Sequence, residues 1–462
     1  MPSRHSSSRR NFLKGAGLAG AASVFSGACS SSDRPRIAKN LIFMVADGMG
    51  VGTLSYAHHW QLRHRGRALE WMQLLQRPGV RRAFQETASA SSPVTDSAAA
   101  GSAWGCGQRV NNRSINFSTD GQALKPIFMY AKEAGKATGL VSTCRITHAT
   151  PASFVANVPH RNAENQIAEQ YLERAIDVCL GGGMRHFKRE DVDLLEAYEA
   201  KGYKLARTKK ELIEFAGQWP LLGLFADSHI PYAIDRANNR DLVETPGLEL
   251  MFEAALKSLQ RCPEGFVLQV EGGRVDHAGH ANDPGAILHE QLEFDRCIPI
   301  AVEFLKANPD TLIIVTTDHG TGGCQLNGWG DGYADSGPAL DRINYFKSSF
   351  EAIGKQIEKR GKFDAAYFEQ MTGLTVTNAK QKTLNEALAQ GVPYISSTIA
   401  NVFADELINA TAIGWTSNNH TSEHVELAAL GPGVNRLPIY LKNYELHGFM
   451  RQALALDGLS EP

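Results

Sequence analysis

The sequence lacks the features that mark membrane-spanning, disulfide-rich and nucleic-acid-binding proteins. Only seven of its 462 residues are cysteines. No CxxC pair occurs among them, so disulfides and free thiols both remain open for the six cysteines beyond Cys29. No apolar run approaches the roughly 18 to 20 residues that a membrane-spanning helix needs. The formal net charge is only −2, and the basic run at 62–67 has no aromatic interleaving, so no nucleic-acid partner is expected.

The first residues are typical of an export signal rather than of a folded segment. Arg9 and Arg10 precede an apolar, small-residue stretch that is too short to span a bilayer. The pattern at 1–28 resembles a twin-arginine signal, which predicts export to the periplasm or the cell envelope. Cys29 follows small residues, so a lipid anchor there remains open. Ser26, however, stands where bacterial lipoproteins usually carry an aliphatic residue.

Short apolar runs rich in β-branched residues recur along the chain and predict buried strands. They lie at 40–47, 138–144, 177–183, 265–273, 311–320 and 425–431. Helix-like segments lie between them, such as the one that starts at Pro246 with Thr245 as its expected N-cap. This alternation predicts an α/β fold, a three-layer sandwich whose largely parallel central sheet has helices on both faces.

The amino-acid composition changes between Gln325 and Ser417, where a glycine-rich stretch is followed by helix-like stretches. We predict a core at 37–324, a crown-like or lid-like insertion at 325–417, and the end of the core, with His420, at 418–462. The insertion could be a lid, a crown, a dimer contact or a set of surface helices with no part in the chemistry.

The segment VEGGRVDHAGH at 270–280 holds three potential metal ligands, Glu271, Asp276 and His280. Asp276 and His280 are spaced i, i+4, so a helix that begins after the glycines would place both on one face. Carboxylate with imidazole suits zinc, whereas carboxylate alone suits magnesium. Taken alone, the segment is equally typical of a glycine turn followed by a polar helix start.

Further candidate ligands follow other predicted strands: Asp47 in ADGMG, and Asp318 with His319 in TTDHG, besides His420 in NNHT. The carboxyl ends of parallel strands meet at one edge of a sheet, so we expect these side chains to form a single site. A lone aspartate at a strand end is usually a helix cap. Several buried carboxylates in one cleft, however, are costly unless cations neutralise them.

Ser97 precedes an alanine-rich helical segment, so its hydroxyl is expected at a helix N-terminus, where free N–H groups attract anions. A bound divalent cation would activate this hydroxyl without a histidine base. The alternative is that Asp96 and Ser97 simply cap the helix. Arg161 offers a bidentate fork for phosphate, although an isolated arginine is more often a surface residue.

Seven motifs occur in a fixed order: ADGMG, TDSAAAGSAW, THATPASFVAN, LGGG, VEGGRVDHAGH, TTDHG and NHT. Together they resemble the alkaline phosphatase family, nearly continuously over about 40–323 and again over about 420–430. The resemblance implies a homodimeric phosphomonoesterase that acts on small phosphate monoesters through a phosphoserine. It also implies two Zn²⁺ ions and one Mg²⁺ ion as cofactors.

The resemblance assigns a role to each candidate residue. The first zinc, which activates water, would be bound by Asp276, His280 and His420. The second zinc, which holds the serine oxygen, would be bound by Asp47, Asp318 and His319. The magnesium site is matched by Asp47, Thr150 and Glu271. The phosphorylated nucleophile, the phosphate clamp and the carboxylate that orients the clamp are matched by Ser97, Arg161 and Asp96.

Two histidines depart from one branch of the family. His148 stands where some members have aspartate near the magnesium ion, and His277 follows the zinc ligand where some have lysine. Nearby imidazole favours softer ions, so Zn²⁺ or Co²⁺ stays open for the third site. We expect both rings to hydrogen-bond around the ions rather than to bind them.

Two other functions fit parts of the sequence. A sulfatase needs a modified residue in a C-x-P-x-R setting, which none of the seven cysteines has, and a phosphodiesterase does not need Arg161. A non-catalytic lipoprotein that binds metal or phosphate does not require Ser97. The motifs therefore favour a phosphomonoesterase.

Overall fold

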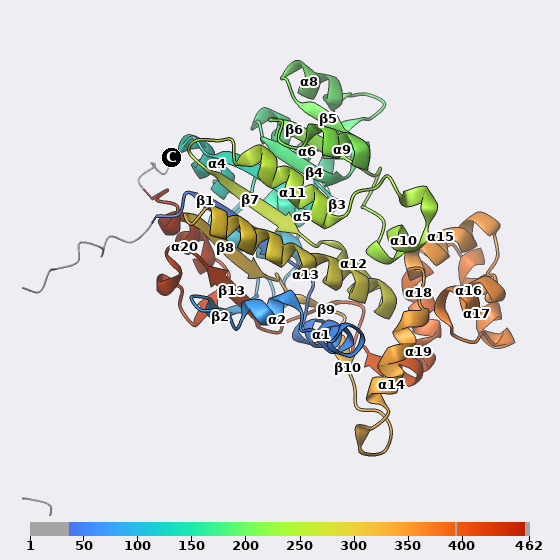
Figure 1. The fold of residues 1–462 in the computed structure, drawn as a ribbon. Coiled ribbons are helices and arrows are strands. Elements are labelled where there is room, and N and C mark those ends of the chain that lie inside the picture. Colours follow the sequence, from blue (N-terminus) through green and yellow to red (C-terminus); the bar gives the residue numbers. More distant parts are fainter. Residues whose placement is uncertain (1–36, 393–394, 458–462) are drawn as a thin grey trace, which may run out of the picture. The chain divides into compact units, whose positions relative to one another are not determined.

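A computed structural model describes residues 37–392 and 395–457. The predicted export signal at 1–28 and Cys29 lie outside the described residues. Within them, ten strands form one central sheet in the order β14-β2-β13-β8-β1-β7-β3-β4-β6-β5 (Figure 1). The strands are β1 (Asn40–Val45), β2 (Arg81–Glu86), β3 (Ala137–Arg145), β4 (Val178–Gly182), β5 (Lys204–Ala206), β6 (Leu221–Leu224), β7 (Phe266–Glu271), β8 (Thr311–Thr316), β13 (Val425–Leu430) and β14 (Tyr440–Lys442).

Most neighbouring strands run parallel, as predicted. The seven strands from β8 to β5 in the sheet order pair parallel, and β14 pairs parallel with β2. Only β13 runs antiparallel to its neighbours, β8 and β2. The six apolar runs of the sequence correspond to β1, β3, β4, β7, β8 and β13, and β3 extends one residue beyond its run at each end.

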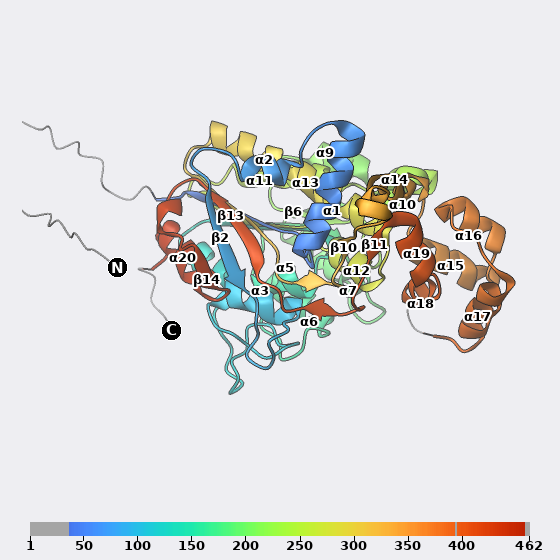
Figure 2. The same cartoon turned by 90° about the horizontal axis from the view of Figure 1, so that it is seen from below.

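Alternate residues of the strands face two separate cores. In β1, Ile42 and Met44 belong to one apolar cluster, while Leu41, Phe43 and Val45 belong to the other. The helices on the first face include α1 (Val51–Arg65), α2 (Glu70–Leu74), α11 (Leu248–Leu259) and α13 (Pro284–Ala307). The helices on the second face include α3 (Ser97–Cys106), α4 (Ile127–Glu133), α6 (Glu164–Glu173), α8 (Leu194–Ala200) and α20 (Glu445–Ala453). The predicted three-layer α/β sandwich is confirmed, and Figure 2 shows its layers from below.

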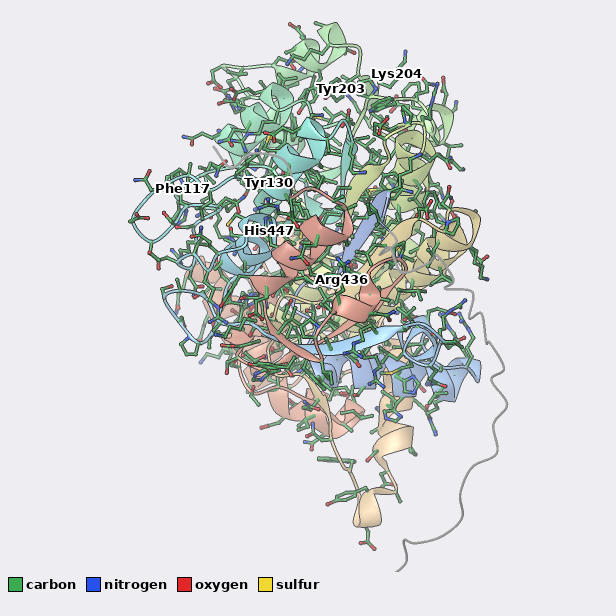
Figure 3. The ribbon with its side chains drawn as sticks, turned by 90° about the vertical axis from the view of Figure 1, so that its left-hand side faces the viewer. Phe117, Tyr130, Tyr203, Lys204, Arg436 and His447 are labelled. Atoms are coloured by element: carbon green, nitrogen blue, oxygen red, sulfur yellow. The ribbon has the colours of Figure 1, made fainter. Side chains whose placement is uncertain are left out.

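Helix α20 fixes the far end of α3, the helix that begins at Ser97. The Nδ1 of His447 lies 2.9 Å from the carbonyl oxygen of Trp104. His447 also packs against Tyr130 of α4, with ring centroids 6.1 Å apart (Figure 3). A surface cavity of about 680 Å³ beside these rings contains Arg436 but no predicted site residue.

Between β8 and β13 the chain leaves the sheet and forms a group of helices (orange in Figure 1). Strands β10 (Gln325–Leu326) and β11 (Ile413–Gly414) pair antiparallel at its base. The helices are α14 (Ser336–Asp341), α15 (Phe350–Arg360), α16 (Ala365–Thr372), α17 (Asn378–Ala389), α18 (Ile395–Val402) and α19 (Ala404–Thr411). The group is joined to the rest of the chain at Asp235 of α10 (Ala233–Asn238), whose carboxylate accepts hydrogen bonds from Ser348 and Ser349.

One local expectation is wrong. The N-cap of α11 is Gly247 rather than Thr245. The Leu248 N–H donates instead to the Glu293 carboxylate of α13, 3.2 Å away, because that packed helix supplies the acceptor that a cap would otherwise provide.

The six described cysteines are free thiols. Among the described residues, none of the helices has the length and apolar character needed to traverse a bilayer.

Candidate metal centre

Three buried carboxylates meet at the carboxyl edge of the sheet. Strand β1 lies between β7 and β8, so Asp47, Glu271 and Asp318 come from three adjacent strands. All three side chains are at most 1% exposed. Gly48 has a φ of +75°, and a Cβ there would lie 2.6 Å from the Asp276 Cα. The loop after β1 can therefore approach α12 (Arg274–His280) only with glycine at this position.

The first predicted ligand group is assembled around Asp276. Its Oδ1 lies 3.4 Å from the Nε2 of His280 and 3.5 Å from the Nε2 of His420. His280 stands one turn along α12, as the i, i+4 spacing predicts. His420 arrives by the antiparallel pairing of β12 (His420–Thr421) with β9 (Gly320–Thr321). In tetrahedral zinc sites, with bonds of about 2.0 to 2.2 Å, ligand atoms are about 3.4 Å apart, so this group fits a zinc ion.

The tautomers of the two rings support the same fit. The Nδ1 of His280 lies 2.6 Å from the Asn418 carbonyl oxygen, and that of His420 lies 2.8 Å from the Thr95 carbonyl oxygen. A carbonyl only accepts, so both Nδ1 atoms donate and both Nε2 atoms of the neutral rings carry lone pairs. These Nε2 atoms are only 2.9 Å apart. Two facing lone pairs beside a carboxylate are the arrangement that a cation stabilises.

The second predicted group, Asp47, Asp318 and His319, is entirely buried. The Nε2 of His319 lies 3.0 Å from Asp318 Oδ2 and 3.9 Å from Asp47 Oδ1. Both carboxylate oxygens lack a hydrogen-bond partner among the described residues. Buried orphan carboxylate oxygens around an imidazole nitrogen fit a second divalent cation.

The third predicted group shares Asp47 with the second. The Thr150 hydroxyl donates to Asp47 Oδ2 over 3.1 Å, and Ser142 donates to Glu271 Oε2. The other oxygen of Glu271 has no partner among the described residues. Carboxylate and hydroxyl oxygens are the ligands that a hard ion such as magnesium prefers, so this group fits such an ion.

Electrostatics shows why cations are needed here. Burial, followed by the Asp318 charge, raises the pKa of Asp47 well above its usual range. Burial raises the pKa of Glu271 to about 7. Burial would raise the pKa of Asp276 as well, but positive charge on His280 and His420, when these rings are protonated, holds it well below its usual range, so a positive charge is stabilised at this position. The ionised forms of Asp47 and Glu271 are therefore costly in this cleft, and bound cations would remove that cost.

Ser97 is the first residue of α3, as predicted, and Asp96 is its N-cap. The Ser97 hydroxyl lies 3.4 Å from His319 Nε2, beside the second ligand group. Asp96 has two functions, because its Oδ1 accepts from the Ala99 N–H while its Oδ2 accepts from Arg161 over 2.9 Å. The Asp96 side chain therefore both caps α3 and orients Arg161.

Arg161 also contacts one of the two unusual histidines. Its Nη2 lies 3.1 Å from the Nε2 of His148, which therefore accepts. The ring of His148 is 5.5 Å from that of His277, centroid to centroid. Together with Asp96, these side chains form a row beside Ser97. All thirteen predicted site residues lie in one region of the structure.

Comparison with known proteins identifies the family of the chain. The sequence matches the family model for alkaline phosphatase over residues 38–456. The chain belongs to the alkaline phosphatase family. Alkaline phosphatase 3 of Bacillus subtilis is 34% identical over 88% of this chain and 87% of its own length. The Escherichia coli enzyme is 32% identical over 63% of this chain and 71% of its own.

Solved alkaline phosphatases share the fold. The crystal structure of the Thermus thermophilus enzyme superposes with a TM-score of 0.84 at 39% identity, covering 91% of this chain and 92% of that one. The cold-active enzyme of Shewanella gives 0.76 at 29% identity over 90% and 99%. Alkaline phosphatases are phosphomonoester hydrolases, so this chain is an enzyme of that class.

Several side chains around this alkaline phosphatase site are not predicted from the sequence. Thr321 donates to Asp276 Oδ1 over 2.6 Å. Its position just after the Asp318–His319 pair, in DHGTGG, is a signal that could have indicated it.

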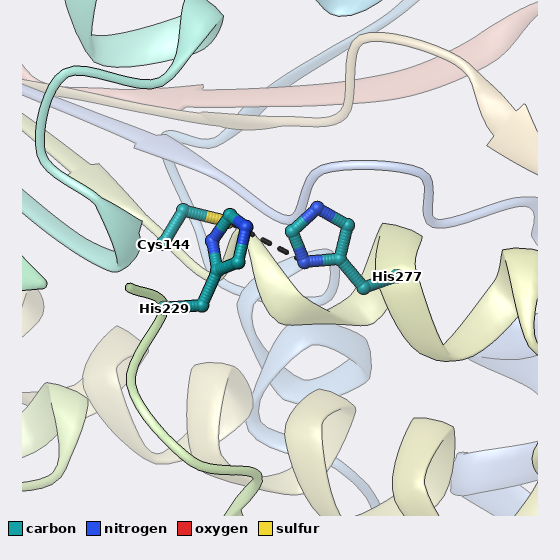
Figure 4. Close-up of side chains that lie close together, drawn as sticks. All are labelled: Cys144, His229 and His277. Carbon is teal, nitrogen blue, oxygen red and sulfur yellow. Dashed lines mark hydrogen bonds between the residues drawn. The ribbon is translucent and has the colours of Figure 1, made fainter. Parts of the chain in front are cut away.

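Cys144 and His229, which were not predicted, form a second group with the predicted His277 (Figure 4). One potential ligand atom from each lies within 4.8 Å of the others, but three of the four ring nitrogens already face an N–H group of an arginine. Arg145 approaches both nitrogens of His229, and Arg274 lies 2.8 Å from the Nδ1 of His277. We therefore interpret this group as hydrogen-bonded imidazoles rather than as an ion site.

Proposed function

We propose that this alkaline phosphatase hydrolyses phosphate monoesters through a phosphoserine at Ser97. The observation that carries the proposal is the position of the Ser97 hydroxyl, at the N-terminus of α3 and 3.4 Å from His319, in the cleft where the buried carboxylates meet. The Ser97 oxygen would attack phosphorus as the ester P–O bond breaks and the alcohol leaves with a proton. Water would then attack the phosphoserine, which releases phosphate and restores the hydroxyl.

The residues would divide their work between ions and substrate. Asp276, His280 and His420 would hold one zinc ion, and Asp47, Asp318 and His319 a second. Asp47, Thr150 and Glu271 would hold a third ion, Mg²⁺ or a softer Zn²⁺ or Co²⁺. When bound, such ions lower the pKa of hydroxyl groups and neutralise phosphoryl oxygens. Thr321 and the Asn418 and Thr95 carbonyls would orient the ligands.

Arg161 would bind the terminal phosphoryl group. Its Nη1 donates to Asp96 and its Nη2 to His148, which fixes the guanidinium beside the N-terminus of α3, where Ser97 stands. A doubly charged monoester gains most from this cation, so the clamp favours monoesters over diesters.

The test is to trap the intermediate. A ³²P-labelled phosphomonoester is mixed with the metal-loaded enzyme at acid pH, and the label is mapped by peptide sequencing. We expect label on Ser97 and none in Ser97→Ala, while Ser118→Ala, on a loop away from the site, labels as the wild type does. A non-catalytic binding protein would leave Ser97 unlabelled in every variant.

We also propose export by the twin-arginine route and a homodimeric state, in line with the sequence. Cell fractionation of an Arg9→Lys, Arg10→Lys variant tests the export signal, because a twin-arginine substrate would then stay inside the cell. Sedimentation of the purified protein tests the dimer. Metabolic labelling with palmitate tests whether Cys29 is lipidated.

A further inference from the structure

A row of three side chains links helix α15, in the helical group between β10 and β11, to the candidate centre. Glu351 of α15 accepts from Arg274 Nη2 over 2.6 Å. The Nη1 of the same guanidinium lies 2.8 Å from the Nδ1 of His277. We propose that Glu351 is a positioning residue, which through Arg274 holds the His277 ring in one orientation with its proton on Nε2.

Other contacts fix the backbone of Arg274 and the ring against which its guanidinium packs, but not the direction of the guanidinium edge. Its side chain is buried, and its guanidinium carbon lies 3.8 Å from the ring centre of Tyr232. Its backbone N–H donates to the Thr143 hydroxyl over 3.1 Å. A buried guanidinium needs an anionic partner, and Glu351 supplies one. By binding Nη2, Glu351 therefore fixes the direction of the other nitrogen, Nη1, which faces His277.

The contact with His277 selects one tautomer. A guanidinium only donates, so the Nδ1 that faces it must be an unprotonated acceptor. The ring proton is then on Nε2, and Figure 4 shows that this second nitrogen points away from the Cys144 side of the ring. Without Arg274 in place, the ring could adopt either tautomer and could rotate.

The orientation matters because of what lies beyond the ring. His277 packs 5.5 Å from His148, whose Nε2 faces the Arg161 guanidinium. Arg274 is buried, whereas His277 is partly exposed. The Nε2–H of His277 is thus a fixed donor on a ring that packs beside His148, held there by Glu351, which lies 77 residues after Arg274 in the chain. This would give the helical group a part in the chemistry.

The inference rests on the proposed function for its effect on rate, but the tautomer is measured without turnover. If the trapping of Ser97 fails while the tautomer behaves as stated below, only the proposed function is wrong. If Ser97 is trapped and the tautomer does not respond to Glu351, only this inference is wrong.

The experiment is ¹⁵N NMR of histidine-labelled holoenzyme, in which His277→Asn identifies the His277 signals. We expect the wild type to show the Nε2–H tautomer. Glu351→Ala should give a mixture of tautomers and lower kcat/KM on a phosphomonoester about tenfold, the value of one charge-assisted hydrogen bond. Glu351→Gln still accepts from Arg274, so it should keep the tautomer and stay within about threefold of wild-type kcat/KM.

The matched control is Lys355→Ala. Lys355 is the other partner of Glu351, at 2.6 Å, and its side chain is exposed. Removing it deletes the surface ion pair and leaves Arg274 in place, so both the tautomer and kcat/KM should stay as in the wild type. A tautomer in Glu351→Ala that matches this control would overturn the inference, as would equal losses in Glu351→Ala and Glu351→Gln.

A second variant covers the case in which Glu351→Ala does not fold. Arg274→Lys keeps a cation for Glu351, but one ammonium cannot span Glu351 and His277 as the planar fork does. We expect folded protein with unchanged metal content and a mixed His277 tautomer. A pure Nε2–H tautomer in Arg274→Lys would show that the ring is held by something else.

Discussion

The Nε2 atoms of His280 and His420 lie 2.9 Å apart, while the Nδ1 atom of each ring faces a backbone carbonyl oxygen. This relationship joins α12 to β12, two segments 140 residues apart in sequence. Without a cation, two lone pairs point at each other beside the Asp276 carboxylate. The local structure is therefore expected to depend on bound metal.

Metal removal should accordingly lower both activity and stability. An ion that binds only the folded state at 1,000 times its Kd contributes about 4 kcal/mol to the free energy of unfolding. We expect treatment with a chelator to abolish phosphomonoester hydrolysis and to lower the thermal midpoint, and added Zn²⁺ with Mg²⁺ to restore both. Chelator presaturated with zinc is the control. Full activity in protein shown to be metal-free by elemental analysis would contradict this expectation.

Arg161→Ala should separate monoesters from diesters. Losing a bidentate charge-assisted contact worth about 1.5 to 3 kcal/mol predicts a fall in kcat/KM on a monoester of about 10- to 100-fold. A diester, with one charge fewer on the phosphoryl group, should lose little. Steady-state kinetics on matched aryl esters measures both. Arg113→Ala is the control, because its exposed side chain lies nearby while only its backbone contacts Asp96.

Several features of this centre follow from local sequence. The apolar runs ending at Asp47, Glu271 and Asp318 predict parallel strands, and the rule that carboxyl ends meet at one edge predicts that these acids converge. The i, i+4 spacing likewise predicts that Asp276 and His280 share a helix face. Each of these arguments needs only residues within one or two elements.

Other features depend on contacts between distant segments. His420 reaches the centre because it pairs with Thr321 of β9. Both strands have only two residues, so neither gives a periodic signal in the sequence. The position of β2 between β13 and β14 comes from pairing partners more than 300 residues away. The contact of Glu351 with Arg274 is equally nonlocal. Such contacts are set by tertiary packing, which propensity and spacing do not encode.

Thr321 should tune zinc affinity. Its hydroxyl donates to Asp276 Oδ1 over 2.6 Å and lies 3.3 Å from His319 Nδ1, so it contacts both predicted zinc groups. Hydrogen-bond partners of metal ligands are typically worth 10- to 100-fold in affinity. We expect Thr321→Val to weaken zinc binding by about that factor, measured by competition with a chromophoric chelator. Thr383→Val, on the exposed side of α17, should bind zinc as the wild type does; equal affinities in the two variants would rule out this role.

Glu290 provides a pH-dependent test away from the metal ligands. Its Oε1 accepts from the Ala233 N–H, while its Oε2 has no partner among the described residues. Burial, together with the Glu293 charge, raises the pKa of Glu290 to about 7 from 4.5. A carboxyl with a raised folded-state pKa favours folding at low pH. That contribution is fully present below about pH 4.5 and is lost as the pH rises through 7, at a cost of up to about 3 kcal/mol.

Glu290→Gln should therefore stabilise the protein at alkaline pH only. The amide keeps an acceptor for Ala233, replaces the orphan oxygen with a donor and carries no charge at any pH. We expect its thermal midpoint to exceed that of the wild type by a few degrees at pH 8 and to match it at pH 4, measured by calorimetry with metals held constant. Glu303 is an exposed acid on the same helix. Glu303→Gln should therefore show no such difference in thermal midpoint between pH 4 and pH 8. A midpoint that falls at pH 8 would mean that Glu290 is held ionised by a cation, with Arg236 the first candidate because its charge lowers the pKa of Glu290.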